Sequence, residues 1–211
     1  MIQTSDLLIF GLAALILVIT PGPNMVYLIS RSITQGRAAG LISLAGVICG
    51  FIFHIVMVSF GLTAILFTIP FAYTLLKTAG IIYLLYLAYQ AIKPGSKSLF
   101  EVQTDLEVDK PARLFTMGFF TNVLNPKVAV FYVSFFPQFI KLENGSILTQ
   151  SFQLGVTQSL ISLTVNFVIV LSASAMADSF ARKPAWIKLQ KWFMATVLTG
   201  LAVKMALEKS K

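Results

Sequence analysis

The chain has 211 residues, of which 57% are hydrophobic and only 11% are charged, with a mean hydropathy of +0.84. Soluble domains carry about 25% charged residues. So few charges cannot cover a soluble surface, and the composition indicates a membrane protein, whose outer face needs no such cover. The formal charge of +8 then favours positive cytoplasmic loops over nucleic-acid binding. The single cysteine, Cys49, excludes an intrachain disulfide, a CxxC pair and a cysteine-rich metal site.

The apolar segments predict about six transmembrane helices, each of which needs about 20 mostly apolar residues. No positive n-region precedes the first run, residues 7–30, so we interpret it as a span and not as a signal peptide. Residues 38–76 are too many for one helix, so Pro70 is expected to separate the second and third spans. The later spans are expected at 71–92, 114–140, within 144–177, and at about 186–207. Lysines crowd the sixth, for which an interfacial amphipathic helix is the alternative.

One hydrophilic segment, residues 93–113, divides the chain into halves of three spans each, 1–92 and 114–211. The segment mixes both charge signs, and we interpret it as a solvated loop or short surface helix joining the halves. Basic residues concentrate here and in the connections after the first and fifth spans. The positive-inside rule therefore places these three connections in the cytoplasm and both termini outside. If the sixth span does not cross, the C-terminus lies inside.

The first and fourth spans are interrupted by the same sequence pattern. V-I-T-P-G-P at 18–23 aligns with V-L-N-P-K-V at 123–128. The aligned pairs are Thr20 with Asn125, Pro21 with Pro126 and Tyr27 with Tyr132. An odd number of spans per half makes such a repeat an inverted one. The fold expected is thus an all-α polytopic membrane protein of two inverted three-helix repeats, in which helices 1 and 4 are discontinuous.

Each interruption has the signature of a helix start, a capping Thr or Asn followed by proline. A helix N-terminus inside the membrane attracts an anion such as a carboxylate. Paired interruptions are a pointer to a transporter's substrate site, although purely structural proline kinks are the alternative. The expected substrate-binding residues are Thr20, Pro21, Gly22, Pro23, Asn24, Asn122, Asn125, Pro126 and Lys127, with Tyr27 and Tyr132 as further candidates or as ordinary span aromatics.

Two titratable residues within the spans are candidates for proton coupling. A lysine at the membrane centre costs about 2.5–3.5 kcal/mol, so Lys127 is expected to face a cavity, where it could bind a substrate carboxylate or exchange a proton, unless it snorkels to the interface. His54 could titrate near neutral pH and couple to protons, or it could simply bond to a neighbouring helix. Gln158, Ser162 and Asn166 share one face of the fifth span, which is expected to line the cavity or to hold helices together.

Two motifs resemble those of the LysE/RhtB superfamily of amino-acid exporters. TPGPN at 20–24 resembles one family signature, and FTMGFFTNVLNPKVAVFYVSFFPQF at 115–139 resembles the pattern F-x-x-G…N-P-K…F-x-x-F-x-P-Q-F. The resemblance covers essentially the whole chain. It is to the RhtB-type branch, similar to exporters of homoserine, threonine, leucine and other neutral amino acids. It implies proton-coupled efflux through the bacterial inner membrane, with the family motifs at residues 21–23 and 125–127.

These observations together predict a secondary exporter of small neutral amino acids with no cofactor and no metal. Its expected partners are the amino-acid substrate, protons and the lipid bilayer, and nucleic acid is not expected. Assembly into a homo-oligomer is left open. The apolar runs offer no Asp or Glu for the substrate's ammonium group, which argues against cationic substrates and against metal cations. Backbone carbonyls, Tyr hydroxyls and amide side chains would have to bind that group. Paired membrane carboxylates, a His cluster and a Cys pair are lacking, so an enzyme is not expected. An exporter or channel for another solute or cation and a structural subunit are the alternatives.

Overall fold

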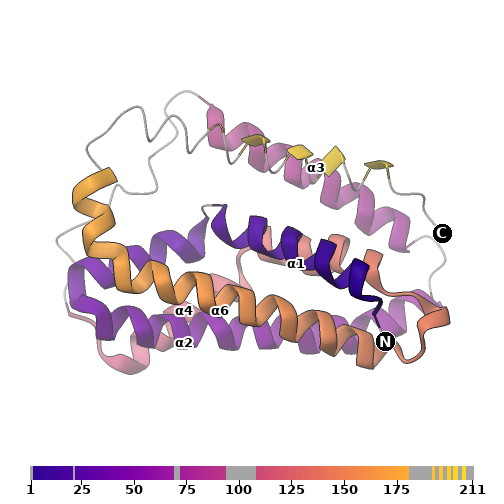
Figure 1. Ribbon diagram of the computed structural model, residues 1–211, viewed down its shortest axis with the longest axis horizontal. Coiled ribbons are helices and arrows are strands. Elements are labelled where there is room, and N and C mark those ends of the chain that lie inside the picture. Colours follow the sequence, from indigo (N-terminus) through magenta and orange to yellow (C-terminus); the bar gives the residue numbers. More distant parts are fainter. Residues whose placement is uncertain are drawn as a thin grey trace.

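The computed structural model describes residues 2–20, 22–68, 72–93 and 108–180, together with scattered helical positions between Trp192 and Leu207. Over these residues the secondary structure is entirely helical, and the helices lie roughly along the long axis of the molecule (Figure 1). The predicted sixth span falls largely outside the described residues, as does Pro70.

The first predicted span is a broken helix. Helix α1 (Thr4–Ile19) ends near the centre of the molecule, and α2 (Pro23–Thr68) begins directly after it. Helix α2 consists of two helices joined at Gly36, whose φ of 85° suits glycine because it has no Cβ. Figure 1 shows α2 leading away from the end of α1, reversing, and running back along the molecule. Residues 23–35 therefore correspond to the end of the predicted first span, and the part of α2 after Gly36 corresponds to the predicted second span.

The fourth predicted span is broken as well. Helix α3 (Ala72–Ile92) is followed by α4 (Pro111–Val123), which starts earlier than the expected residue 114 because Pro111 is already helical. The chain breaks at Leu124 and Asn125, and continues as α5 (Pro126–Val130), the π-helical turn η1 (Phe131–Phe135) and the 3₁₀ turn η2 (Phe136–Phe139). A further turn, η3 (Leu142–Asn144), leads to the long helix α6 (Ile147–Phe180).

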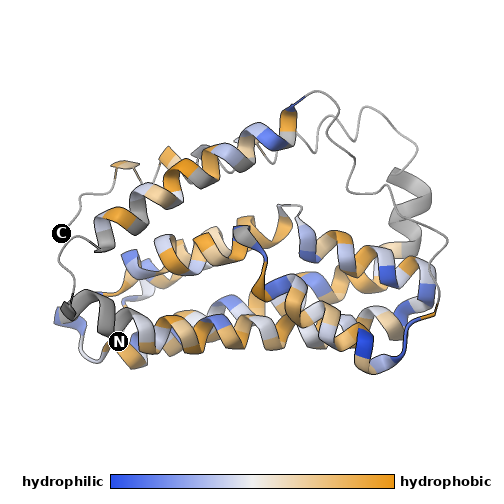
Figure 2. Cartoon of the chain, turned by 180° about the vertical axis from the view of Figure 1, so that it is seen from behind, coloured by the Kyte–Doolittle hydropathy of each residue, from blue (hydrophilic) through white to orange (hydrophobic). Residues whose placement is uncertain are grey.

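The outer surfaces of the helices are apolar, as expected for contact with lipid. By length and composition, two stretches of the described residues could cross a membrane: one lies within Pro23–Gly61, which turns at Gly36, and the other is Ile147–Ala173. Leu12 on α1, Phe60 on α2 and Leu160 on α6 each expose more than half of their surface. Figure 2 shows hydrophobic residues along the lengths of the helices.

The interior is held together by aromatic packing and by close helix contacts. The Phe10 ring of α1 lies 5.7 Å from the Phe136 ring and 5.2 Å from the Phe139 ring, which joins α1 to the fourth span. Between α2 and α4 two glycines let the backbones touch: a Cβ on Gly46 would overlap the carbonyl oxygen of Phe115, and one on Gly118 would overlap that of Ser43. Small residues permit such close packing of membrane helices. This packing brings the second span against the start of the second half.

Candidate functional site

The first break ends one helix and starts another at adjacent positions. The backbone N–H and the hydroxyl of Thr20 both donate to the carbonyl of Ile16, at 2.9 and 2.6 Å, so Thr20 closes the C-terminus of α1. The prediction that Thr20 caps the start of the next half-helix is therefore wrong. The proline that begins α2 is Pro23, which moves the capping position to Gly22. Pro21 lies outside the described residues.

The second break contains the helix start that the sequence predicts. The Asn125 side chain accepts a hydrogen bond from the Lys127 backbone N–H at 3.0 Å, and Pro126 is the first residue of α5. The Asn125 carbonyl accepts from the Ala129 backbone N–H at 2.9 Å, which closes the first helical turn. Asn125 is thus an N-cap inside an otherwise apolar span, and this prediction is confirmed.

The two breaks meet in the interior. The amide nitrogen of Asn125 donates to the side-chain oxygen of Asn24 at 3.1 Å, across 101 residues of sequence. The Lys127 ammonium donates to the carbonyls of Leu17 at 3.0 Å and Thr20 at 2.5 Å. Lys127 is only 8% exposed, so it does not snorkel to the interface. The C-terminal carbonyls of a helix carry the negative end of its dipole. The ammonium therefore lies where α1 favours a cation.

Lys127 has no carboxylate partner among the described residues, whose ion pairs are Arg31–Asp109, Arg113–Asp109 and Lys141–Asp6. The ammonium also lies close to Gly22, where a Cβ would be 3.0 Å from its nitrogen. A buried cation held by carbonyls alone is a site that an anionic group of a ligand would satisfy better.

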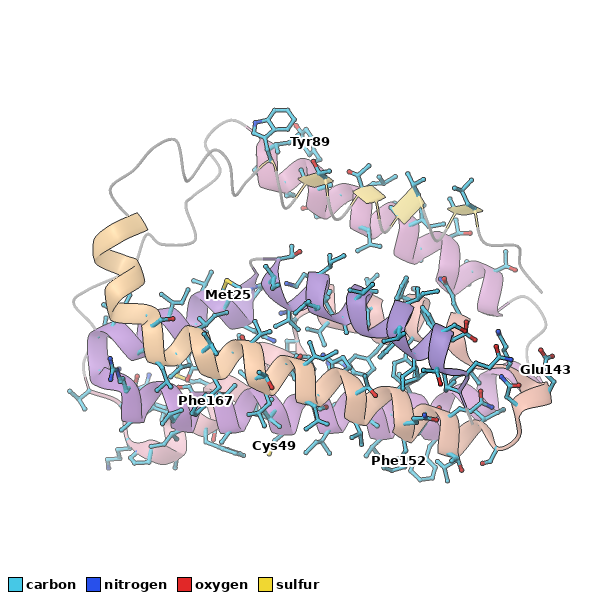
Figure 3. The ribbon with its side chains drawn as sticks, in the orientation of Figure 1. Met25, Cys49, Tyr89, Glu143, Phe152 and Phe167 are labelled. Carbon is cyan, nitrogen blue, oxygen red and sulfur yellow. The ribbon has the colours of Figure 1, made fainter. Side chains whose placement is uncertain are left out.

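A small cavity lies beside the meeting point. Its water-accessible volume of about 20 Å³ is on the order of one water molecule. Met25, one of the lining residues, lies near the start of α2 in the middle of the molecule (Figure 3). The lining residues are Leu17, Val18, Asn24, Met25, Phe51, Lys127, Val128 and Asn166. They come from both breaks, from the second span and from α6, and they enclose too little space for an amino acid in this conformation.

Asn122 and His54 lie next to the second break. Asn122 is fully buried against Gly50, where a Cβ would come within 2.6 Å of the Asn122 Cβ. Neither the amide nitrogen nor the amide oxygen of the Asn122 side chain has a hydrogen-bond partner among the described residues. The Asn122 carbonyl lies 3.4 Å from His54 Nε2 and accepts its proton in the corresponding tautomer. His54 thus contacts a neighbouring helix, the alternative that the sequence left open beside proton coupling.

Tyr132 extends this polar region to α6. Its ring stacks on the His54 ring at 5.2 Å, and its hydroxyl donates to Gln158 at 2.6 Å. Gln158 in turn donates to the Ser162 hydroxyl at 2.7 Å, and Asn166 donates to the Ser162 carbonyl at 2.8 Å. The polar face of α6 therefore both holds helices together and, through Asn166, lines the cavity.

Tyr27, the sequence counterpart of Tyr132, has a different environment. Its hydroxyl donates to the Leu114 carbonyl at 2.7 Å and accepts from Ser43 at 3.1 Å, which joins α2 to α4. The Arg31 guanidinium lies 5.6 Å from the centre of its ring. These partners are outside the predicted substrate site, so the structure does not bring Tyr27 together with the two breaks.

Sequence reasoning missed an ion-pair network at the end of the central loop, in which Asp109 and Arg31 are buried and Arg113 is exposed. Asp109 accepts from Arg31 at 2.7 Å and exchanges two hydrogen bonds with Gln35, at 2.9 and 2.8 Å. Arg113 binds the other carboxylate oxygen at 3.2 Å. The Asp109 side chain is only 6% exposed, although the loop was predicted to be solvated. The only local signal in the sequence was Arg113, which lies four residues after Asp109, the spacing of an i,i+4 ion pair.

These features define an all-helical membrane protein with a buried cation between two broken helices. The chain belongs to the LysE type translocator family, which it matches over residues 15–209. It is therefore a membrane transporter and not an enzyme, and the resemblance stated from its motifs is confirmed.

Characterised relatives align with most of the chain. A homoserine/homoserine lactone efflux protein of Salmonella typhimurium is 32% identical over 184 residues, covering 87% of this chain and 84% of the relative. A leucine efflux protein of Klebsiella pneumoniae is 26% identical over 205 residues, covering 94% and 93%. A leucine efflux protein of Salmonella choleraesuis is 25% identical over 193 residues, covering 92% and 91%. No solved structure matches the chain.

Proposed function

We propose that this protein exports small neutral amino acids, of the size of homoserine or leucine, through the bacterial inner membrane. The observation that carries the proposal is the buried Lys127 ammonium at the meeting point of two broken helices, without a carboxylate partner among the described residues. A substrate carboxylate would supply that partner. The efflux activities of the relatives support the same substrate class.

The substrate site proposed here consists of the residues around the two breaks. Asn24, Asn125 and Lys127 supply polar groups, and Asn166 adds an amide from α6. Directly before the second break, Asn122 offers a buried amide that has no hydrogen-bond partner in the described part of the chain. The small cavity would have to enlarge to admit an amino acid, which fits a transporter that alternates between closed and open states.

We further propose that the two halves, residues 1–92 and 114–211, are inverted three-helix repeats joined by the segment 93–113. The matched breaks in the first and fourth spans support this arrangement. It would place the substrate site at the interface of the repeats.

Proton antiport is proposed as the driving force, with Lys127 and His54 as the groups that exchange the proton. Both are buried next to the second break, Lys127 within α5 and His54 against Asn122. If His54 takes part, His54→Gln should make transport independent of the proton gradient while the protein remains folded. Persistence of the gradient dependence would leave His54 with a packing role.

The test of the function is uptake into inside-out membrane vesicles, in which export appears as accumulation. Homoserine, threonine, leucine and lysine are offered with and without a protonophore. We expect the neutral amino acids to accumulate in a gradient-dependent way and lysine to accumulate far less. Lys127→Ala should abolish uptake, whereas Lys93→Ala, which removes an exposed lysine, should not. Normal uptake by Lys127→Ala would contradict the proposed role of Lys127.

A further inference from the structure

The end of α1 has the features of a cation-binding subsite. The carbonyl oxygens of Leu17 and Thr20 both accept from the Lys127 ammonium, which comes from the other half of the chain. We propose that these two carbonyls form the subsite for the α-ammonium group of the substrate, and that Lys127 occupies the subsite when no substrate is bound. The inference rests on the proposed export of amino acids.

The chemistry of the two occupants is the same. A lysine side chain and an α-amino group both present a primary ammonium with N–H donors. The subsite binds it through backbone oxygens at the negative end of the α1 dipole, and half-helix C-termini in transporters bind cations in this way. Backbone carbonyls can thus bind the substrate ammonium group even though the apolar runs contain no Asp or Glu.

Exchange of the two ammonium groups keeps the charge of the site balanced. An entering zwitterion brings one ammonium, which replaces Lys127 on the carbonyls, and one carboxylate, which pairs with the displaced Lys127. The net charge of the buried site is then the same before and after binding. An amine without a carboxylate would leave two cations in one buried site, at a high cost. The arrangement therefore selects neutral amino acids over amines.

Gly22 leaves room for the bound ammonium. A Cβ at this position would lie 3.0 Å from Lys127 Nζ and 3.2 Å from Cε, so any side chain there crowds the group on the carbonyls. Gly11, earlier on α1, is a matched control, because among the described residues a Cβ there would meet only Ile161 Cδ1, at the ordinary contact distance of 3.7 Å.

The test is equilibrium binding to the purified full-length protein with three probes: leucine, its decarboxylated analogue isopentylamine, and its deaminated analogue isocaproate. Lys127→Met empties the carbonyls and removes the second cation. We expect it to bind isopentylamine at least about tenfold more tightly than the wild type does, because charge-assisted hydrogen bonds to the carbonyls become available. Affinity for isocaproate should not rise. Unchanged affinity for isopentylamine in folded Lys127→Met would overturn the inference.

Gly22→Ala gives a second test that does not depend on the folding of Lys127→Met. It should weaken leucine binding several-fold, and in the Lys127→Met background it should cancel the gain for isopentylamine. Gly11→Ala should change neither affinity. Unaltered leucine binding by Gly22→Ala would contradict the subsite. Isopentylamine binding to Lys127→Met tests the carbonyl subsite without measuring transport. A failure of the subsite inference is therefore distinguishable from a failure of the proposed amino-acid export.

Discussion

The Asn125 side chain connects the two halves of the protein by donating to Asn24 at 3.1 Å while accepting from the Lys127 backbone N–H at 3.0 Å. The amide oxygen of Asn125 therefore caps α5, while its amide nitrogen bonds to the first break. Because Asn125 is 1% exposed, both bonds are shielded from bulk solvent.

A double-mutant cycle measures the bond between the breaks. Asn125→Ala should lower the free energy of unfolding by about 1–3 kcal/mol, since it loses a cap and a buried hydrogen bond. Asn24→Ala should cost about 1 kcal/mol. The double variant should cost less than the sum, by about 1 kcal/mol. Unfolding of the purified protein in detergent gives these values, and strict additivity would show that the two side chains do not interact.

The two ion-pair sites should differ in their contribution to stability. Asp109→Asn leaves the Arg31 guanidinium buried without a counter-charge, which should cost about 3–5 kcal/mol. Asp6 pairs with Lys141 at 2.8 Å, but their side chains are 23% and 29% exposed, so Asp6→Asn should cost less than about 1 kcal/mol. Added salt should weaken the second contribution more than the first, because screening acts mainly on exposed charges and Arg31 and Asp109 are buried. Equal losses in the two variants would contradict this difference.

The stability contributed by Lys141 should disappear at alkaline pH. The hydrogen bond to Asp6 is the main cause that raises the pKa of Lys141 above its ordinary value of 10.5. A group whose folded pKa is raised stabilises the protein at lower pH, and this contribution is lost as the pH rises through the folded value. The difference in unfolding midpoint between the wild type and Asp6→Asn should therefore shrink above about pH 10.5. If the difference in unfolding midpoint stays constant above about pH 10.5, the ion pair with protonated Lys141 does not contribute to stability.

Two glycines of the second span offer a matched comparison. Gly46→Ala would force a Cβ into the carbonyl oxygen of Phe115, whereas no described residue lies within 4 Å of the Cβ position of Gly61. Overpacking of this kind costs about 1–3 kcal/mol, so Gly46→Ala should lower the unfolding temperature in detergent. Gly61→Ala should leave it unchanged or slightly raised, because alanine favours the helix. A Gly46→Ala protein as stable as Gly61→Ala would mean that α2 and α4 do not touch there.

The sequence predicted the breaks well where the signal was local. A cap followed by proline identifies a helix start within three residues, and at Asn125 that signal is correct. At the first break the same reasoning failed for Thr20, because two prolines compete to begin the helix and Pro23 does so. Thr20 then satisfies its hydroxyl on Ile16 instead. The rule of a cap followed by proline does not decide between a helix start at Pro21 and one at Pro23, because that choice depends on how the following helix packs.

Apolar composition, the length of the apolar runs and the two proline motifs by themselves determined that this is a helical membrane protein of the LysE type whose helices are interrupted at the two proline motifs. Only the tertiary structure decided that the Lys127 ammonium binds the carbonyl end of α1 and that Asp109 is buried against Arg31. The reason is distance along the chain. Helix starts and lipid-facing runs depend on residues within one or two turns, whereas the Lys127 ammonium finds its partners 107 and 110 residues away, through the packing of two half-helices.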